Sequence, residues 1–305
     1  METEFLAWLG KELPPHNCLR LGLGDDAAIV ALAGRPECLV TVDMINDQVD
    51  FDLAKDDPRR IGRKALAVNL SDIAAMAGRP LAAVIALALP RAGALALAKE
   101  LYLGMLPLAD QFDFAIAGGD TNCWDGPLAI SVTMLGEIAE RGALKRSGAR
   151  PGDWLLATGS FGGSILGRHF DFEPRVREAL VVNERYELHA GMDVSDGLSL
   201  DASRLAEASG CGVALRLGAI PISSAAETLA AERNDGISPL EHALSDGEDF
   251  ELLLAVGADE ARRLLRDQPL GTSLTAIGEF VPEPGLWQVD LAGTRKPLPP
   301  RGWVH

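Results

Sequence analysis

The amino-acid sequence predicts a mixed α/β protein of the α+β class, divided into two domains. The chain has 305 residues, of which 48% are hydrophobic, so it can supply two ordinary domains with a substantial core. Runs with strand character alternate with helical stretches along the chain. A segment rich in glycine, basic residues and proline, 140–153, interrupts this alternation. We therefore predict an amino-terminal domain over residues 1–139 and a carboxy-terminal domain over residues 140–305.

The predicted elements follow from hydrophobic periodicity in each half. Strands are expected in the first half at CLVTVD (38–43), LAAVIALALP (81–90), FAIAGGD (114–120) and LAISVTMLGEI (128–138). Helices are expected there near residues 58–77 and 92–110. The second half predicts strands at WLLATG (154–159), GVALRL (212–217) and FELLLAV (250–256), and helices after SDGLSLD (195–201) and at about 258–267.

The net charge and the cysteine content limit which binding partners and which cellular compartment we expect. Because 44 acidic residues outnumber 28 Lys and Arg, giving a net charge of −16, nucleic acid is not an expected partner. The four cysteines have no CxxC spacing, which argues against disulfides and thiolate metal sites. The acidic amino-terminus has no signal-peptide pattern, and no apolar run is long enough to span a membrane. We expect a cytoplasmic protein that does not bind membranes.

Acidic motifs beside glycines or at predicted strand ends recur six times. They are GDDAA (Asp25, Asp26), TVD (Asp43), NLSD (Asp72), GGD (Asp120), DVSDG (Asp193, Asp196) and DGED (Asp246, Glu248, Asp249). Glycine lets a ligand approach the backbone closely, and carboxylate oxygens are ligands that Mg²⁺ prefers. Any one motif is equally compatible with ordinary Asp-Gly turn chemistry. Six of them in one chain favour metal and phosphate binding.

Asp72 is the most informative of these carboxylates because it lies in an otherwise apolar stretch, NLSDIAAMAGRP. An ionised carboxylate there is costly unless it is paired or bound to metal. The structural alternative is a helix N-cap at Ser71 or Asp72.

Phosphoryl transfer assisted by several Mg²⁺ ions is the chemistry that these residues favour. Cations would allow an acidic protein to hold a polyphosphate, by neutralising both the carboxylates and the nucleotide. The usual nucleotide signatures are absent, since the one Gly-Lys pair is followed by Glu12 and no GxGxxG follows a strand. In KRSGARPGD, Arg146 and Arg150 flank a glycine turn, which suits either a phosphate contact or an exposed linker.

Seven segments, taken in order, resemble one family. GDDAAIV, TVDM, KALAVNLSDIAAMAGRP, GGDTN, LKRSGARPGDWLLATG, MDVSDGLSLD and LSDGEDFELLL are similar to the motifs of thiamine-monophosphate kinases, within the superfamily that includes aminoimidazole ribonucleotide synthetase. The similarity runs from about residue 20 to 280 and recurs at the terminal Gly-Trp. It implies direct transfer of the γ-phosphoryl group of ATP to thiamine monophosphate, giving thiamine diphosphate without a covalent enzyme intermediate. It also implies a two-domain aminoimidazole ribonucleotide synthetase-like fold, with the amino-terminal domain paired in a homodimer and the nucleotide held between domains.

The resemblance also assigns roles to individual residues, with several Mg²⁺ ions as cofactors and ATP as co-substrate. The implied metal ligands are Asp26, Thr41, Val42, Asp43, Asp72, Asp120, Asp193 and Asp196. The implied nucleotide contacts are Gly119, Asp120, Arg146 and Ser195. Asp43, Asp72, Asp120 and Arg146 are the implied catalytic residues. Asp50, Glu248 and Trp303 are the residues implied for the acceptor, Glu248 facing its cationic or amino-bearing part and Trp303 stacking on a ring.

The chain departs from the family pattern at several positions. Asp50 replaces the histidine expected beside the acceptor, and a carboxylate there repels the acceptor phosphate unless a metal intervenes. Arg63 replaces an expected tryptophan, and Val42 replaces a small hydroxyl residue but retains a backbone carbonyl. The stretch from Gly167 to Met192 is shorter than expected. These departures keep two alternatives open: a related Mg-ATP-dependent kinase or synthetase with another acceptor, and a non-catalytic nucleotide-binding regulator.

Overall fold

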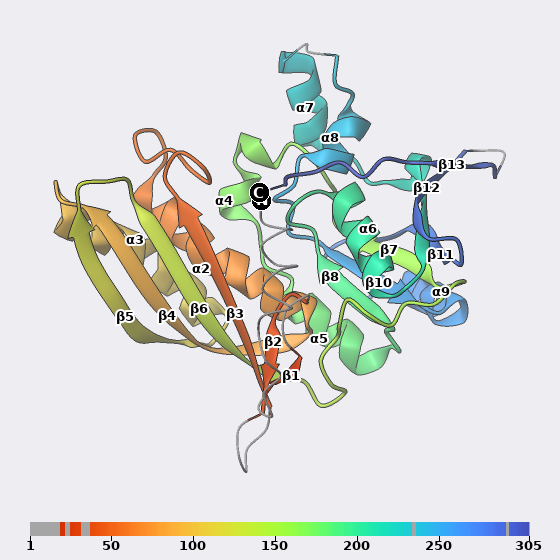
Figure 1. The fold of residues 1–305 in the computed structure, drawn as a ribbon, viewed down its shortest axis with the longest axis horizontal. Coiled ribbons are helices and arrows are strands. Elements are labelled where there is room, and N and C mark those ends of the chain that lie inside the picture. The colour runs from red at the N-terminus through yellow and green to blue at the C-terminus, as the bar shows by residue number, and fades with distance from the viewer. Residues whose placement is uncertain (1–18, 22–24, 32–36, 234–235, 291–292, 305) are drawn as a thin grey trace.

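The computed structural model of the chain contains two β-sheets that lie side by side, each accompanied by helices (Figure 1). It describes residues 19–21, 25–31, 37–233, 236–290 and 293–304. The amino-terminal segment in which no signal peptide is expected, and Cys18, lie outside these ranges. Within them, no helix combines the length and the apolar character needed to cross a membrane.

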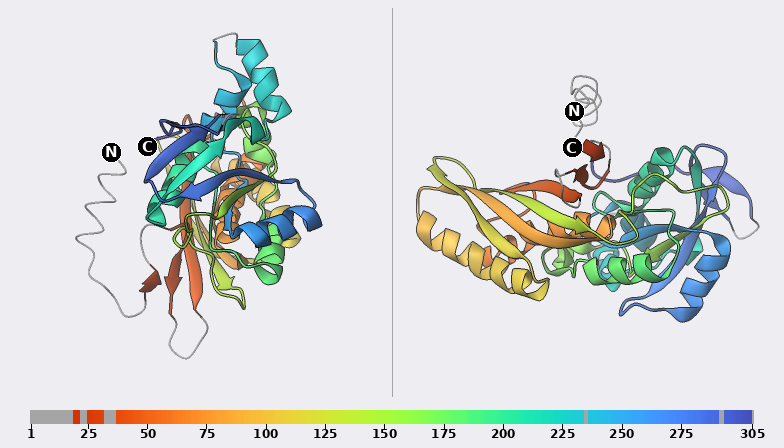
Figure 2. Two further views of the ribbon diagram at one scale, coloured as in Figure 1. Left: turned by 90° about the vertical axis from the view of Figure 1, so that its right-hand side faces the viewer. Right: turned by 90° about the horizontal axis from the view of Figure 1, so that it is seen from below.

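The first sheet has six strands in the order β1-β2-β3-β6-β4-β5. Their bounds are β1 Leu19–Leu21, β2 Ala28–Val30, β3 Cys38–Asn46, β4 Gly78–Pro90, β5 Ala115–Trp124 and β6 Ala129–Ile138. Only β4 and β5 pair in parallel, as expected for strands joined by a crossover helix. Helices α2 (Pro58–Ala75) and α3 (Ala94–Gln111) cover one face of this sheet, as the right-hand view of Figure 2 shows.

Helix α2 begins at a clear sequence signal and packs very closely on α3. Asp57 accepts a hydrogen bond from the backbone N–H of Arg59, and Pro58 occupies the first turn. A Cβ placed on Gly62 would lie 2.1 Å from the carbonyl oxygen of Leu101, and one on Gly104 would lie 1.8 Å from that of Arg59. The two glycines therefore allow the backbones of the helices to touch.

The second sheet has seven strands in the order β13-β12-β9-β11-β7-β10-β8. Its strands are β7 Trp154–Thr158, β8 Ala190–Asp193, β9 Gly212–Arg216, β10 Leu252–Val256, β11 Leu274–Val281, β12 Gly285–Val289 and β13 Arg295–Pro297. The helices of this half are α4 Arg168–Asp171, α5 Val176–Arg185, α6 Leu198–Ala208, α7 Ser224–Arg233, α8 Pro239–Ser245 and α9 Ala258–Asp267, with short 3₁₀ turns at Ser164–Leu166 and Leu217–Ala219. Most strand pairs are antiparallel, and β9 and β12 are parallel.

The hydrophobic core is continuous across the two halves. One buried cluster extends from Leu39 and Leu70 of the first half to Leu156 and Leu252 of the second. A second cluster lies within the carboxy-terminal half and includes Leu205 of α6. This shared apolar contact holds the carboxyl end of α2 against the second half, where α2 contacts β8.

The expected strands and helices are all present, with ends shifted by a few residues. Both halves therefore have the mixed α/β character that the sequence predicts. The N-cap alternative for Asp72 is wrong, because Asp72 lies in the last turn of α2 and Asp57 is the cap. The domain limits at 139 and 140 stay a prediction.

Candidate active site

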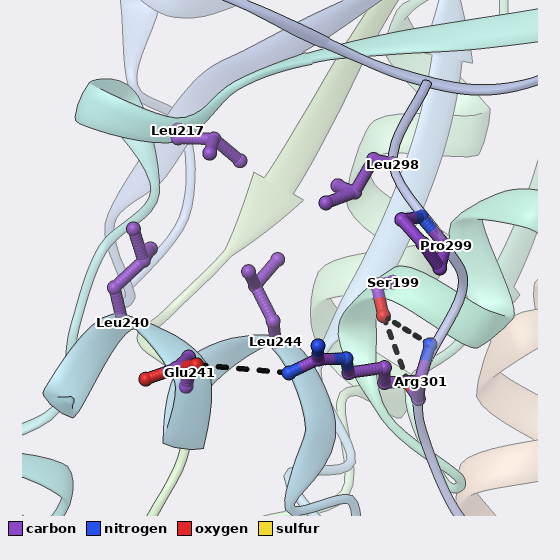
Figure 3. A pocket seen from close by; sticks show the side chains of 8 residues that line it. All are labelled: Ser199, Leu217, Leu240, Glu241, Leu244, Leu298, Pro299 and Arg301. Carbon is purple, nitrogen blue, oxygen red and sulfur yellow. Dashed lines mark hydrogen bonds and ion pairs between the residues drawn. The ribbon is translucent and has the colours of Figure 1, made fainter. Parts of the chain in front are cut away.

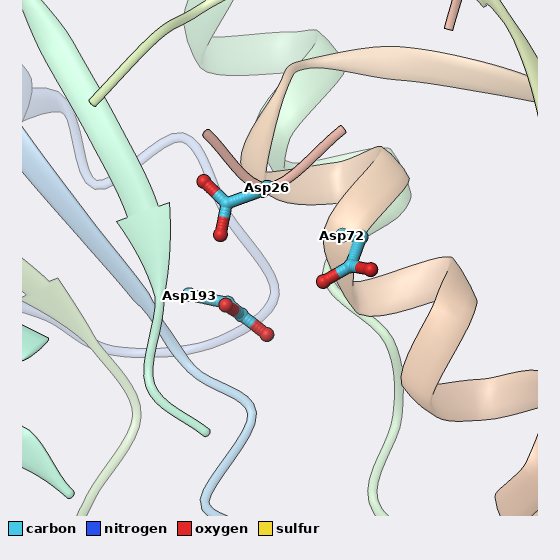
Figure 4. A group of neighbouring side chains, drawn as sticks. All are labelled: Asp26, Asp72 and Asp193. Atoms are coloured by element: carbon cyan, nitrogen blue, oxygen red, sulfur yellow. The ribbon is translucent and has the colours of Figure 1, made fainter. Parts of the chain in front are cut away.

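Three carboxylates from distant parts of the chain meet where the two halves join. Asp26 lies just before β2, Asp72 lies in the last turn of α2, and Asp193 ends β8. One carboxylate oxygen from each lies within 4.8 Å of the others, and Figure 4 shows the three side chains facing one another. Asp26 and Asp193 are buried and Asp72 is half-buried. The cluster is therefore built from both halves of the molecule.

The carboxylates resist ionising together. Burial raises the pKa of Asp72 well above its usual range, and Asp43, Asp193 and Asp26 add to this shift by repulsion. Burial also raises the pKa of Asp193, with Asp26 as the next cause. The pKa of Asp43 rises to about 6, again chiefly by burial, while a hydrogen bond with Asp72 opposes the rise. Negative charge is thus concentrated here beyond what nearby groups neutralise.

Two hydroxyl groups orient this cluster. Thr41 of β3 donates to Oδ2 of Asp72, and Ser71 donates to Oδ2 of Asp193. Ser71 directly precedes Asp72 on α2. This helix therefore supplies the carboxylate of Asp72 and also holds that of Asp193. The sequence predicts Thr41 at the site. It does not indicate the role of Ser71, because its partner, Asp193, lies far away in the sequence.

Arg146 is the cation that contacts the cluster. Its Nη2 lies 2.7 Å from Oδ1 of Asp26 and its Nε lies 3.0 Å from Oδ2, which makes a bidentate pair. Its backbone N–H also faces the carboxylate of Asp25. Although burial alone would lower it, the pKa of Arg146 is raised because Asp26 favours the charged form. Arg146 is therefore part of the site and not an exposed linker residue, while Arg150 is exposed.

The segment with Ser195 and Asp196 is held by a residue that sequence reasoning missed. Oδ2 of Asp201 accepts hydrogen bonds from the backbone N–H groups of Ser195, Asp196 and Gly197 at 2.9 to 3.1 Å. Arg204 contacts the carboxylates of both Asp196 and Asp201. In the sequence, the role of Asp201 is indicated only by its place as the last residue of the motif SDGLSLD. Asp201 fixes the backbone beside Asp193.

The three predicted acceptor residues lie in three different segments. Glu248 has a left-handed backbone (φ 53°), and its N–H donates to the carbonyl of Ser195 at 2.6 Å. Trp303 is 62% exposed and its Nε1 donates to the carbonyl of Asp246. Oδ2 of Asp50 accepts from the N–H of Asn46 at 2.7 Å. The carboxylate of Asp50 therefore closes its own turn.

Within one chain, Gly119 and Asp120 lie far from the carboxylate cluster. In the strand register, Asp43 pairs with Val132 of β6. Val132 pairs with Ile85 of β4, which in turn pairs with Gly119 of β5. Three strand spacings of about 4.8 Å place roughly 14 Å between Asp43 and this part of β5. The fold of a single chain does not bring Asp120 to the other predicted ligands.

Val42 and Arg63 are two of the departures from the family pattern, and both lie in described parts of the structure. Val42 is 62% exposed on the face of the first sheet that α2 and α3 do not cover. Arg63 donates to the carbonyls of Phe170 and Phe172 at 2.8 and 2.6 Å. Arg63 therefore ties α2 to the segment that carries α4, within the short stretch from Gly167 to Met192.

A pocket of about 200 Å³ lies elsewhere in the second half (Figure 3). It is lined by Ser199, Leu217, Leu240, Glu241, Leu244, Leu298, Pro299 and Arg301. Its volume is below the range of about 300 to 1,000 Å³ that is typical of ligand pockets. It contains none of the predicted site residues.

Comparison with known proteins matches both halves of the chain. Residues 24–138 match the family described as AIR synthase related protein, N-terminal domain, and residues 141–287 match the corresponding C-terminal domain. A thiamine-monophosphate kinase of Rhodopirellula baltica is 42% identical over 100% of this chain and 97% of its own length. One of Caulobacter vibrioides is 32% identical over 100% of this chain and 90% of its own.

A solved structure is similar over nearly the whole chain. It is AaThiL complexed with AMPPCP and TMP, with a TM-score of 0.84, 27% sequence identity, and coverage of 99% of this chain and 96% of that one. The matches to the two relatives and to this structure cover both halves of the chain. The chain therefore belongs to the thiamine-monophosphate kinase family.

Proposed function

We propose that the protein transfers the γ-phosphoryl group of ATP to the phosphate of thiamine monophosphate and so produces thiamine diphosphate. The observation that carries this proposal is the cluster of Asp26, Asp72 and Asp193, with Arg146 beside it, at the junction of the two halves. Family membership and the similarity to a complex with AMPPCP and TMP support the same reaction. An acidic site of this kind suits two phosphate-bearing substrates only if cations accompany them.

The residues of the cluster fit Mg²⁺. Oxygen atoms from three carboxylates converge, as a hard cation requires, and Arg146 is already paired with Asp26. Burial, followed by repulsion from neighbouring carboxylates, raises the pKa values of Asp72 and Asp193, so both hold a negative charge poorly without a nearby cation. Bound Mg²⁺ would neutralise this charge and that of the phosphate oxygens, and so favour phosphoryl transfer. We assign Asp26, Asp72 and Asp193 as ligands, with Thr41 and Asp43 beside them.

The protein's own contribution is positioning and electrostatic stabilisation. Thr41 and Ser71 hold the carboxylates of Asp72 and Asp193 in fixed orientations through hydrogen bonds. The guanidinium of Arg146 supplies a fixed positive charge for the polyphosphate as charge spreads in the transition state. Asp201 holds Ser195 and Asp196 so that their segment can contact the nucleotide.

Direct transfer between the two substrates suits this arrangement. The described side chains around the cluster are carboxylates, hydroxyl groups already donating to them, and Arg146. Thr41 and Ser71 donate to Asp72 and Asp193, which we assign to the metal, so we propose neither hydroxyl as a nucleophile. Glu248 and Trp303 on the carboxy-terminal half offer a carboxylate and an exposed indole to the thiamine portion. In-line transfer would then need only the alignment of two bound substrates.

A homodimer would complete the site. The uncovered face of the first sheet exposes large apolar side chains, namely Val42, Met44, Leu81, Val84 and Trp124. In the described residues, β5 pairs only with β4, and β3 beyond Val40 pairs only with β6. In a two-fold dimer, each copy would place its β5 beside the other's free β3 edge, so that the two sheets close on each other with their apolar faces inside. It would also bring the partner's Asp120 toward Asp43.

The function is tested by incubating the purified protein with MgATP and thiamine monophosphate and separating the thiamine phosphates by chromatography. We expect thiamine diphosphate and ADP in equal amounts, and neither without Mg²⁺. ADP production should also require the acceptor, because no phosphoryl-enzyme is formed. ATP binding without thiamine diphosphate production would refute the proposed acceptor. Binding of neither nucleotide nor Mg²⁺ would refute the kinase activity itself.

A further inference from the structure

Lys64 is a completely buried lysine that joins three separate segments near the acceptor residues. Its side chain has 0% exposure. Its Nζ lies 2.6 Å from Oε1 of Glu248 and donates to the carbonyl of Asp50 at 2.9 Å. The ammonium group also lies 5.5 Å from the centre of the Phe170 ring. One cation from α2 thus contacts two of the three segments in which acceptor residues are predicted, and α4 as well.

Stability alone does not account for a charge at this position. Removing an ammonium group from water costs several kcal/mol, and a buried ion pair is often no more stabilising than apolar side chains of the same size. The surroundings of Lys64 include Phe170, so a methionine would find apolar neighbours there. Glu248 remains 31% exposed at its side chain, so the pair is buried on one side and open on the other. An ion pair in this position suits a carboxylate, that of Glu248, whose orientation matters.

The segment that Lys64 contacts is held in an unfavourable backbone conformation. Glu248 and Phe250 both have left-handed backbone φ angles, 53° and 51°, which residues other than glycine rarely adopt. Hydrogen bonds on either side retain this shape, since their N–H groups donate to the carbonyls of Ser195 and Val194. The carboxylate of Asp249 between them accepts from the N–H of Gly162. The backbone is therefore fixed by its neighbours, whereas the side chain of Glu248 is fixed by Lys64.

We infer that Lys64 is a positioning residue for the acceptor: it orients the carboxylate of Glu248 and holds the Asp50 turn against it, so that both bind thiamine monophosphate in one defined arrangement. This inference rests on the proposed function, because it assigns Glu248 to the acceptor. It also explains how the predicted acceptor residues can keep their arrangement although Asp50 stands in place of the expected histidine. The backbone carbonyl of Asp50, which any residue possesses, is the group that Lys64 binds.

The test compares Lys64→Met, Glu248→Gln and the double variant in steady-state kinetics with each substrate varied. Loss of the aimed carboxylate should raise KM for thiamine monophosphate about tenfold, while KM for ATP changes less than about twofold. The double variant should be no worse than the poorer single variant, because both substitutions remove one shared interaction. Arg59→Met is the matched control, because Arg59 lies on the same helix in an exposed pair with Glu100. It should leave both KM values unchanged.

Hydrogen exchange of the substrate-free protein supplies a readout that does not depend on activity. Lys64→Met should speed exchange at residues 46–51 and 246–250 and leave the rest of α2 unchanged. Equal rises in both KM values, or faster exchange throughout α2, would overturn the inference and make Lys64 a structural residue. If the wild-type protein made no thiamine diphosphate, the proposed function would fail. The exchange experiment would still decide whether Lys64 joins the two segments.

Discussion

Asp72 lies among carboxylates that disfavour its ionised form. It lies between the carboxylates of Asp26, Asp43 and Asp193, and burial together with their repulsion raises its pKa well above the usual range. A helix that needed only a polar residue at this point would place it toward solvent. The retention of a carboxylate among other carboxylates is understood if the side chain binds a cation.

Replacing Asp72 by Asn tests this role directly. The amide keeps the size and the contact with Thr41 but removes the charge, so kcat should fall by about a hundredfold or more at saturating Mg²⁺. The apparent Mg²⁺ requirement should also rise. Circular dichroism and melting temperature serve as controls for folding, and relief of repulsion should leave stability in EDTA equal or higher. Undiminished turnover would exclude Asp72 as a ligand.

We expect Asp249 to make the stability of the protein depend on pH. Its carboxylate is buried, which raises its pKa to about 8, although Arg168 and the N–H of Gly162 pull in the opposite direction. Because the folded-state pKa lies above the unfolded value of 3.8, the folded state binds this proton more tightly. The resulting stabilisation is complete below about pH 4 and is lost as pH rises to about 8. Asp246 and Glu251 face the same region and are unchanged in the test below.

Asp249→Asn cannot ionise and should lose this dependence. The melting temperature of the variant minus that of the wild type should therefore increase between pH 5 and pH 9, measured at a fixed Mg²⁺ concentration. Calorimetry at several pH values provides the comparison. A difference that stays constant across this range would show that Asp249 does not bind a proton more tightly in the folded state.

At the scale of elements, α2 organises the site. It carries Ser71 and Asp72 at its carboxyl end, where they reach the cluster, and Lys64 in its middle, where it reaches the acceptor segments. Arg63 on the same helix binds the carbonyls of Phe170 and Phe172. The helix therefore sets the spacing between the metal side and the acceptor side, so its own placement against α3 and the sheet is critical.

The contact between α2 and α3 depends on glycine. Gly104→Ala would put a Cβ 1.8 Å from the carbonyl oxygen of Arg59, so the helices must separate. Overpacking of this kind should lower the free energy of unfolding by about 1 to 3 kcal/mol. Gly271→Ala is the control, because a Cβ there meets nothing within 4 Å. Denaturant titration measures both, and equal stabilities would show that α2 and α3 do not touch as described.

At the scale of the whole molecule, the first sheet leaves a predicted ligand far from its partners. Asp120 lies on β5, three strands away from β3, which carries Asp43. The proposed dimer resolves this separation, because each site would combine the carboxylate cluster of one chain with the partner's Asp120. The same arrangement would bury the apolar face that one chain exposes.

Mixed dimers distinguish a shared site from a site within one chain. A heterodimer of Asp120→Asn and Asp72→Asn chains, isolated with two affinity tags, retains one intact site if sites are shared. It should show about half of the wild-type turnover, although each homodimer is inactive. The matched control pairs Asp26→Asn with Asp72→Asn, which damages both clusters and should remain inactive. Titration with Mn²⁺ followed by electron paramagnetic resonance should give the same pattern for ion binding. No recovery in the first heterodimer would place Asp120 outside a shared site.

Local sequence was sufficient for the elements and for the chemical character of the site. The cap at Asp57, the helical periodicity of α2 and α3, and the alternation in β3, β4 and β6 depend on neighbouring residues and on burial of one face. The six acidic motifs likewise predict a site for cations and phosphate. These features persist in the fold because each depends on interactions over a few residues.

The sequence by itself determined which residue types the protein brings to its chemistry, and tertiary structure decided which of them meet. Arg146 against Asp26, Ser71 against Asp193, and Lys64 against Glu248 join residues far apart in the chain. No local pattern encodes such pairs, because they follow from the packing of distant segments against one another in the folded chain. The separation of Asp120 from the cluster has the same cause, since the order of strands in a sheet is a property of the whole fold.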